Sequence, residues 1–579
     1  MATAAFYYHP DGYETRRKEL MGRHAAGEAF LHAYVQHAGQ DKLYCYAQTQ
    51  KHYNHFVSKV RDRAEKPLVC SWIPWGQWTR LTEPGCLFMP GPVLKDLSWQ
   101  RRHGDTRAYS VCGITHTTAT QTVMDALGDL LVAPVQPWDA LICTSASVKT
   151  MVTQLSENHS QYLQQHFGLP ASPSCRVQLP VIPLGVNCDD LDKSAEQRAA
   201  ARHEWREKLK IPKDAVAFLF VGRLSSYGKA HPVPMFLALE EAAKSASVPI
   251  DLILAGWFNS KAMEEDFIAA AREFCPSTIV HIVDGRTPEV RSFIWYAADV
   301  FTSLSDNIQE TFGLTPIEAM AAGLPSVVSD WNGYKETIKD GIDGFRVPTW
   351  MAAPGMGEKL AFGHAIGVLN YDQYIGCQSQ FTSVDVHAAA QAYLTLANDA
   401  ALRKEMGEAA RRRARAEFDW RVIIPAYDAL WSELAEIRKR APEVTPRVAG
   451  QPANPLRDDP TRLFRSYPTH YLEADTAVAK TSACNTDLVS RLKRLSINNI
   501  ADGIAADRQQ IERMISKLDD DASPVKTVLS TIPDAEKRNA ALSLLWLAKM
   551  GMVELNERAK ARRYQRARAA RCAAPTFPS

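Results

Sequence analysis

The chain has 579 residues, of which 46% are hydrophobic and 23% charged, and its formal net charge at pH 7 is +2. This composition is typical of a globular protein with several domains, and the small net charge favours neither nucleic acid nor a strongly acidic partner. The eleven cysteines form no C-x-x-C pair and no Cys/His group with zinc-like spacing, so we expect reduced, buried thiols and no metal site.

The first residues, MATAAFYYHPDGYE, lack a basic segment followed by an apolar stretch, and no run of about 18 apolar residues occurs in the chain. Neither a secretory signal nor a transmembrane helix is therefore expected. These patterns predict a cytoplasmic protein whose contact with a membrane, if any, is peripheral and at the inner face.

Residues 1–187 contain short apolar runs, with helical patterns between several of them. The runs predicted to be strands are AAFYYHP, KLYCYAQT, PLVCSWIPW, CLFMPG, AYSVCGITH and DALICTS. This alternation predicts a Rossmann-like lobe, which we assign to the acceptor side.

Residues 188–440 repeat the theme more regularly. The strand candidates are AVAFLFVGRL, IDLILAG, TIVHIVDG, DVFTSLS and PSVVSD, each separated from the next by a helical pattern. Buried apolar runs that alternate with amphipathic helices imply a parallel sheet covered on both faces. We therefore predict an α/β fold of two doubly wound lobes, joined near residues 187–213, with ligands bound between them beyond the carboxyl ends of the strands.

The second lobe includes an insert and a crossover helix, and two further segments follow it. Residues 349–383 form an insert without clear periodicity, and a helical pattern then resumes and includes a crossover helix near 420–438. Residues 441–460 carry five prolines, which predicts a linker. Beyond it, residues 461–579 are predicted to form a mostly helical accessory module with a basic tail.

The segment 306–325, DNIQETFGLTPIEAMAAGLP, places Glu310 and Glu318 on either side of a glycine turn. A structural interpretation makes Thr315 an N-cap, Pro316 the first helical residue and Glu318 the partner in a capping box, worth about 1 kcal/mol. Gly323 and Pro325 then mark the end of the helix.

A functional interpretation of the same turn is that Gly313, Leu314 and Thr315 present free backbone amides to an anion at a helix start. A diphosphate is the obvious candidate. A carboxylate one turn further on, from Glu318, suits ribose hydroxyls, and Glu310 suits the hydroxyls of a sugar.

The longer segment ETFGLTPIEAMAAGLPSVVSDWNGYKETIKDGIDGF resembles the donor-binding core of glycosyltransferase family 4, the retaining nucleotide-sugar transferases of GT-B fold. The resemblance covers residues 180–350 well and 400–435 moderately, whereas the first lobe matches in outline. It implies transfer of a hexosyl unit from a UDP- or GDP-type sugar to an acceptor hydroxyl, with retained configuration and no metal or other cofactor. In this family the second glutamate holds the ribose and the first contacts the donor sugar, which implies these roles for Glu318 and Glu310.

The loop FVGRLSSYGKAHP contains Gly222, Arg223 and Lys229. The resemblance implies that Arg223 and Lys229 neutralise the donor diphosphate. A departing nucleoside diphosphate develops negative charge, which two fixed cations stabilise without a metal. The alternative is a pair of solvated loop cations, and KAHP departs here from the usual KG of the family.

Further candidates rest on weaker patterns. His116, at a strand end in the first lobe, is implied to contact the donor sugar, although a histidine there is often bonded to backbone. Asp284 and Gly285 match the position where the nucleobase lies against main chain. Gly22 lies at a helix start that approaches donor or acceptor in the family, and the alternative is that it turns or caps the chain.

Aromatic residues in the insert, Trp350, Tyr371, Tyr374 and Phe381, suit either an acceptor-facing role or ordinary packing, and we favour packing. In the C-terminal module a faint winged-helix pattern is explained equally well by three packed helices that bind a protein partner. The basic tail between Arg558 and Arg571 is interpreted as solvated, with an anionic membrane as the alternative.

The sequence thus predicts a retaining glycosyltransferase of glycan, polysaccharide or glycoconjugate synthesis, with a glycan, lipid-linked, protein or small-molecule acceptor left open. No side chain is a clear covalent nucleophile, which agrees with same-face attack assisted by the leaving phosphate. The alternatives are a phosphorylase or nucleotide-sugar epimerase on the same fold, or a non-catalytic scaffold that acts through the C-terminal module.

Overall fold

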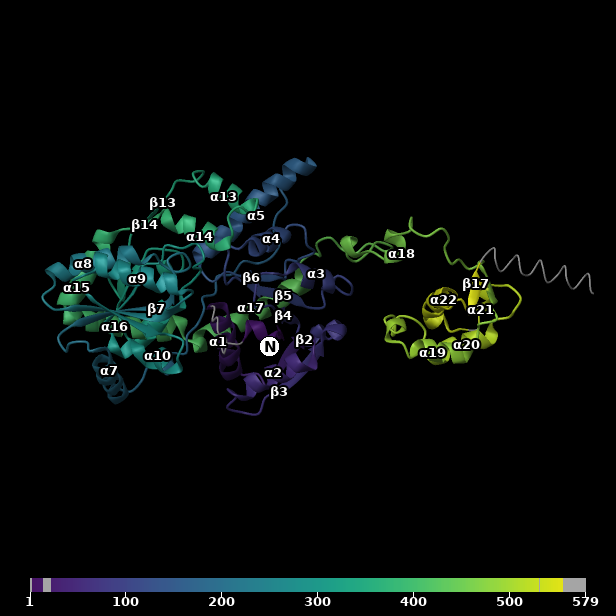
Figure 1. Cartoon of the computed structure of the whole chain (residues 1–579), viewed down its shortest axis with the longest axis horizontal. Coiled ribbons are helices and arrows are strands. Elements are labelled where there is room, and N and C mark those ends of the chain that lie inside the picture. Colours follow the sequence, from purple (N-terminus) through teal and green to yellow (C-terminus); the bar gives the residue numbers. More distant parts are fainter. Residues whose placement is uncertain (1–2, 14–21, 531, 556–579) are drawn as a thin grey trace, which may run out of the picture. The chain divides into compact units, whose positions relative to one another are not determined.

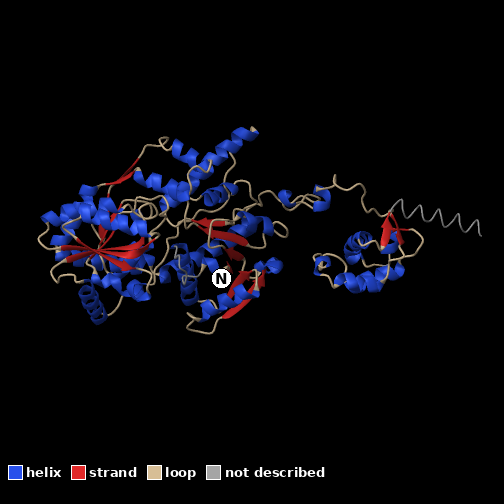
Figure 2. Cartoon of the chain, viewed as in Figure 1, coloured by secondary structure: helices blue, strands red, loops and turns tan. Residues whose placement is uncertain are grey.

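The computed structural model describes residues 3–13, 22–530 and 532–555. The chain divides into two compact units, Met1–Arg457 and Asp458–Ser579. Within the described residues, the first unit contains two six-stranded sheets surrounded by helices (Figures 1 and 2).

The sheet of the first lobe has the strand order β3-β2-β1-β4-β5-β6, and every neighbouring pair is parallel. Its strands are β1 (Ala5–Tyr7), β2 (Lys42–Ala47), β3 (Val69–Pro74), β4 (Cys86–Phe88), β5 (Ser110–Ile114) and β6 (Ala140–Ile142). The helices between them are α1 (Gly22–His37), α2 (Gln50–Arg61), α3 (Lys95–Arg101), α4 (Gln121–Asp129) and α5 (Ala146–Phe167). This is a doubly wound order, with a switch point between β1 and β4.

The sheet of the second lobe has the same topology, in the order β12-β11-β10-β7-β8-β9, and is also parallel throughout. Its strands are β7 (Val216–Leu224), β8 (Ile250–Phe258), β9 (Ile279–Asp284), β10 (Val300–Ser303), β11 (Ser326–Ser329) and β12 (Gly344–Val347). Its helices are α6 (Cys188–Leu191), α7 (Ala195–Leu209), α8 (Pro232–Ser245), α9 (Lys261–Phe274), α10 (Pro288–Phe293), α11 (Leu314–Ala322), α12 (Tyr334–Thr337), α15 (Val386–Asn398) and α16 (Ala400–Arg413). The predicted fold of two doubly wound lobes is confirmed.

The chain crosses between the lobes twice, and the two crossings are bonded to each other. The Val186 amide donates to the Phe418 carbonyl at 2.8 Å, and the Trp420 amide donates to the Val186 carbonyl at 3.1 Å. Gly185 is required here because a Cβ at that position would lie 2.5 Å from the Trp420 ring. The backbone of the two crossings is therefore held as one short ladder.

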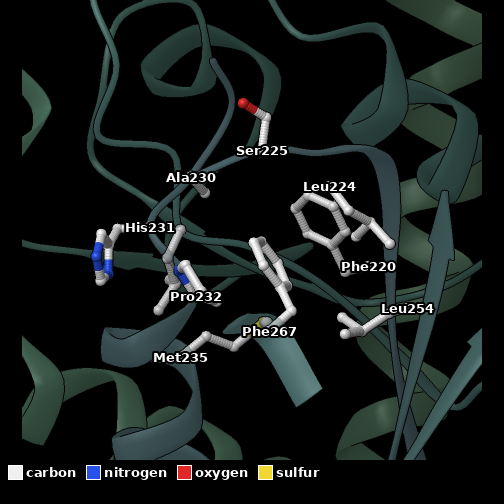
Figure 3. A pocket seen from close by; sticks show the side chains of 10 residues that line it. Phe220, Leu224, Ser225, Ala230, His231, Pro232, Met235, Leu254 and Phe267 are labelled. Atoms are coloured by element: carbon white, nitrogen blue, oxygen red, sulfur yellow. The ribbon is translucent and has the colours of Figure 1, made fainter. Parts of the chain in front are cut away.

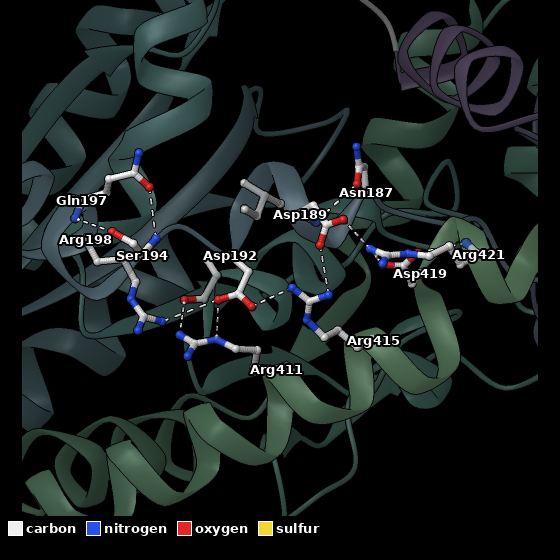
Figure 4. A network of polar contacts seen from close by, with 12 residues as sticks. Asn187, Asp189, Asp192, Ser194, Gln197, Arg198, Arg411, Arg415, Asp419 and Arg421 are labelled. Carbon is white, nitrogen blue, oxygen red and sulfur yellow. Dashed lines mark hydrogen bonds and ion pairs between the residues drawn. The ribbon is translucent and has the colours of Figure 1, made fainter. Parts of the chain in front are cut away.

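Ion pairs reinforce this ladder, as Figure 4 shows. Asp189 and Asp192 follow the first crossing. Arg415 comes from the π-helical segment Ala414–Phe418 that follows α16, and Arg421 from the start of α17 (Trp420–Arg440). Arg415 reaches Asp192 at 2.7 Å and Arg421 reaches Asp189 at 2.6 Å. Because most of these groups are partly exposed, we assign the network to orientation of the crossings rather than to large stabilisation.

Helix α17 returns the chain to the first lobe, as predicted for 420–438. Its aromatic residues pack into the core of that lobe: the Tyr427 ring lies 4.7 Å from Phe30, and Trp431 lies 6.0 Å from Phe88, centroid to centroid. The buried residues of α17 recur at helical spacing, which ties its orientation to the first sheet.

The insert has regular structure that its sequence did not reveal. Strands β13 (Thr349–Met351) and β14 (Thr382–Val384) pair antiparallel, and helices α13 (Glu358–Ala365) and α14 (Tyr371–Gln380) lie between them. Trp350 and Phe381 are 71% and 67% exposed. The packing interpretation is therefore wrong for these two aromatic residues: Trp350 in β13 and Phe381 at the end of α14 are both mostly exposed.

The proline-rich segment is attached to the first lobe over its first part. The Val444 amide donates to Gln136 at 2.8 Å, and Arg102 donates to the Ala453 carbonyl at 2.8 Å. Thr106 donates to Glu443 at 2.6 Å. The boundary between the two units falls after Arg457, within the segment predicted as a linker.

The second unit combines helices with a small antiparallel sheet of order β16-β15-β17 in its described residues. Its strands are β15 (Ala477–Lys480), β16 (Ser523–Pro524) and β17 (Val553–Leu555), and its helices are α18 (Pro460–Leu463), α19 (Thr486–Lys493), α20 (Arg508–Lys517), α21 (Val525–Leu529) and α22 (Asp534–Lys549). The predicted basic tail lies outside the described residues. Among the helices of the described chain, none is long and apolar enough to cross a membrane.

Candidate functional site

The candidate residues of the second lobe gather at its topological switch point. Strands β7 and β10 are neighbours, and their following connections leave toward opposite sides of the sheet. Gly222 and Arg223 are near the carboxyl end of β7, and the chain after β10 leads to Glu310 and then to α11. Ligands of doubly wound sheets bind at this position.

Glycines allow the backbone of adjacent strand ends to approach closely at this edge. A Cβ on Gly256, at the end of β8, would lie 2.0 Å from the Gly222 carbonyl oxygen. The Gly285 amide in turn donates to the Gly256 carbonyl at 2.9 Å. The backbones of Gly222, Gly256 and Gly285 thus lie against one another at this edge of the sheet. Gly256 was not predicted from the sequence.

Lys229 and Glu310 form an ion pair, with Nζ and Oε2 separated by 2.7 Å. Burial raises the pKa of Glu310, but Lys229 and the backbone amides of Phe312 and Thr311 outweigh this, and the net pKa lies below its usual value. The carboxylate is therefore held ionised at the start of the glycine turn. The structure brings these two predicted residues into direct contact.

Helix α11 starts earlier than predicted. Its first residue is Leu314, and Gly313 is the N-cap, with φ +95° and no side-chain cap hydrogen bond. The predicted capping box of Thr315, Pro316 and Glu318 is therefore wrong: the glycine in the left-handed region lets the helix begin one residue after it. The predicted end is confirmed, because Gly323 follows Ala322 with φ +86°.

This correction changes the interpretation of Glu318. In the described chain its carboxylate takes part in no hydrogen bond and no ion pair, so helix capping does not account for it. Burial raises the pKa of Glu318 to about 7, although the nearby charges of Lys229 and Arg291 act in the opposite direction. A half-buried acid that has no partner among the described residues is a candidate for ligand binding.

Gly313 is also fixed by its neighbours. A Cβ there would lie 2.1 Å from the Tyr334 ring. The Asn332 side chain, in the following turn, donates to the Glu310 carbonyl at 2.7 Å and accepts from Ser145 of the first lobe at 3.0 Å. Asn332 has φ +45°, and its Asn-Gly turn was a visible signal, but the role of the residue was not predicted from the sequence.

Arg223 has no carboxylate partner within the described residues. One of its nitrogens, Nη2, donates to the Gly228 carbonyl at 3.2 Å, which folds the side chain over the loop that leads to Lys229. Under this loop, side chains including Phe220, Leu224 and Phe267 surround a hollow of about 10 Å³ (Figure 3). A hollow of this size holds about one water at most, so it supports the loop and is not a ligand site.

His116 lies where the first lobe meets the glycine turn. Its backbone carbonyl accepts a hydrogen bond from the Thr311 hydroxyl at 3.1 Å. Thr311 is adjacent to Glu310, so the structure places His116 beside the predicted donor residues. Thr311 itself, which forms the link, was not singled out by the sequence.

Asp284 and Gly22 are less closely connected to this cluster. Asp284 forms an exposed ion pair with Arg286 at 2.8 Å, and hydrogen bonds from Arg286 lower its pKa. Gly22 is the first residue of α1. Among the described residues, no group of three or more His, Cys, Asp or Glu side chains is arranged to hold a metal ion.

Comparison with known families decides the class of the second lobe. The family model of glycosyl transferases group 1 matches residues 201–353, which contain β7 to β13 and every candidate residue of the second lobe. The second lobe contains a group 1 glycosyltransferase domain. Arg223, Lys229, Glu310 and Glu318 all lie within the residues that match this family.

Curated relatives that match part of this chain are named as glycosyltransferases. The D-inositol 3-phosphate glycosyltransferase of Xylanimonas cellulosilytica is 29% identical over 171 residues, which are 29% of this chain and 39% of the relative. The enzyme of the same name from Corynebacterium urealyticum is 30% identical over 189 residues, or 31% of this chain and 43% of the relative. The chain thus spans about two fifths of the length of these relatives.

Solved structures show more distant similarity. Alr3699/HepE of Anabaena in complex with UDP is 13% identical, with 75% of this chain and 100% of that chain covered and a TM-score of 0.46. Sucrose-phosphate synthase from Thermosynechococcus elongatus is 18% identical, with coverage of 75% and 98% and the same TM-score.

Proposed function

We propose that this protein is a retaining glycosyltransferase that transfers a hexosyl unit from a nucleoside-diphosphate sugar to an acceptor hydroxyl. The observation that carries the proposal is the arrangement around the switch point of the second lobe. Two cations, two largely covered carboxyl groups and the N-terminal end of α11 meet there, within a group 1 domain.

Each part has a role in this reaction. Arg223 lacks a carboxylate partner in the described chain, so its guanidinium binds the diphosphate by donating hydrogen bonds, and the diphosphate supplies the opposite charge. The free amides that follow Gly313 bind phosphate oxygens at the start of α11. Glu318 accepts hydrogen bonds from the ribose, and Glu310, held by Lys229, orients the hydroxyls of the sugar.

Acceleration then comes from charge and position. As the glycosidic bond to phosphate breaks, negative charge grows on the leaving diphosphate, and preorganised Arg223 and Lys229 stabilise it. The acceptor hydroxyl attacks on the face from which the phosphate leaves, so the leaving phosphate can receive its proton. These cations supply the positive charge at the diphosphate, and we propose that no metal is required.

The direct test is calorimetric titration of the full chain with UDP, GDP, ADP and their hexose conjugates. Tight binding of one nucleotide to the wild type, lost in Glu318→Ala, is the expected result and identifies the base. Transfer is then assayed with that donor and a panel of acceptors that includes inositol 3-phosphate, since relatives are named for it. Absence of binding to every nucleotide would contradict the proposal and favour a scaffold role.

A further inference from the structure

Helix α14 of the insert lies on the loop that precedes Glu310. Tyr371, Ile375 and Ser379 are spaced four residues apart and so share one face of the helix. Ile375 is fully buried and Ser379 nearly so, whereas Asp372 and Gln373 are exposed. At Gly376 the helix passes so close to the cation loop that a Cβ would lie 3.0 Å from Cβ of Tyr227.

A chain of hydrogen bonds leads from this helix to Arg223. The Tyr371 hydroxyl donates to Oε1 of Gln309 at 3.2 Å. The Gln309 amide nitrogen donates to the Gly228 carbonyl at 3.5 Å, and Arg223 donates to that same carbonyl at 3.2 Å. Tyr371 thereby orients the Gln309 side chain, which donates to the same Gly228 carbonyl as the Arg223 guanidinium.

Tyr371 also lies at the boundary with the first lobe. Burial raises the pKa of its phenol, and the neighbouring Thr117 hydroxyl and Arg223 guanidinium act in the opposite direction. Thr117 follows His116 directly, so the insert, the first lobe and the cation loop meet around one phenol ring.

We propose that Tyr371 is a positioning residue for the donor diphosphate. Through Gln309 and the Gly228 carbonyl it holds the Arg223 guanidinium in place before the donor binds, so that little reorganisation is needed on binding. The inference rests on the proposed function, and it assigns a role to an insert for which the sequence indicated none beyond packing or stacking on an acceptor.

The test compares Tyr371→Phe with Tyr374→Phe on the same helix. Tyr374 stacks on His364 at 4.2 Å and takes no part in the chain of hydrogen bonds, which makes it a matched control. Affinities for UDP and GDP are measured by calorimetry, and those for uridine and guanosine by competition. Losing one hydrogen bond predicts about three- to tenfold weaker binding of the nucleoside diphosphate.

A residue that acts through Arg223 affects the phosphates and not the base. Nucleoside affinity and melting temperature should therefore match those of Tyr374→Phe, and Tyr371→Phe should have no further effect in an Arg223→Ala background. Equal weakening of nucleoside and diphosphate, or no weakening of either, would overturn the inference while leaving the proposed function intact. A wild-type protein that binds none of these nucleotides would overturn both.

Discussion

Nζ of Lys229 lies 2.7 Å from Oε2 of Glu310, so two side chains predicted for different parts of the donor form one ion pair. Lys229 is 30% and Glu310 9% exposed, and the carboxylate also accepts hydrogen bonds from the amides of Thr311 and Phe312. The pair links the cation loop after β7 to the glycine turn after β10. Substitution of either residue should therefore leave the charge of the other without its partner.

We expect Lys229→Met to lower stability by about 1–3 kcal/mol, because it leaves a nearly buried carboxylate without its counter-charge. The pKa of Glu310 is lowered in the folded protein, so its contribution to stability is present above an unfolded value near 4.5 and is lost as the pH falls. The defect should accordingly be largest at neutral pH and shrink in acid. Thermal melts at pH 4 to 8 measure this, and the double variant Lys229→Met/Glu310→Gln should recover stability without recovering transfer.

Glu318 should give the opposite pH dependence. Burial raises its pKa from 4.5 to about 7, so its contribution to stability is full below pH 4.5 and is lost as the pH rises through 7. A difference of this size corresponds to an effect on the order of 3 kcal/mol. As the pH rises from 5 to 8, the melting temperature of Glu318→Gln should therefore increase relative to that of the wild type. Parallel curves of melting temperature against pH for the two proteins would contradict this. Glu310→Gln is the control, whose melting temperature should not increase relative to that of the wild type over this pH range.

Arg223→Ala should lower kcat/KM for transfer. The expected loss of transition-state stabilisation is about 2–4 kcal/mol, the scale of losing one preorganised donor in a catalytic site. The physical reason is that Arg223 has no carboxylate partner in the described chain and is free to bind the diphosphate. Lys261→Ala, which removes an 87% exposed cation of the same lobe, should leave the rate unchanged. Steady-state kinetics with the donor identified by calorimetry decide the matter, and a loss below about tenfold, or 1.4 kcal/mol, would refute the assignment.

Gly313→Ala should damage both stability and nucleotide binding. The residue has φ +95°, which costs a non-glycine residue about 1–2 kcal/mol, and the new Cβ would meet the Tyr334 ring at 2.1 Å, adding about 1–3 kcal/mol of overpacking. Gly341→Ala is the matched control, because Gly341 also has positive φ, +71°, but open space around its Cβ position. Melting temperatures and calorimetry should separate the two variants, and equal effects would show that contact with Tyr334 is unimportant.

The sequence by itself determined the two parallel sheets, because short apolar runs that alternate with amphipathic helices can be buried on both faces in few other ways. It also supplied Glu310 and Glu318 as candidates, through the glycine turn before a helix, and Arg223 and Lys229 through the resemblance of their loop to the glycosyltransferase family; the roles of these four residues stay predictions. The helix end at Gly323 was predictable for a similar reason, as glycine readily adopts the left-handed conformation found there.

Tertiary structure alone decided the pairing of these residues and the contacts of the insert. The start of α11 at Leu314 follows from the positive φ of Gly313 under Tyr334, a contact between residues 21 positions apart. The Lys229–Glu310 pair joins residues 81 positions apart, and the Tyr371–Gln309 bond joins residues 62 apart. Local patterns record propensity and burial, whereas such contacts depend on how strand ends and loops meet in space, and no periodicity along the chain specifies that.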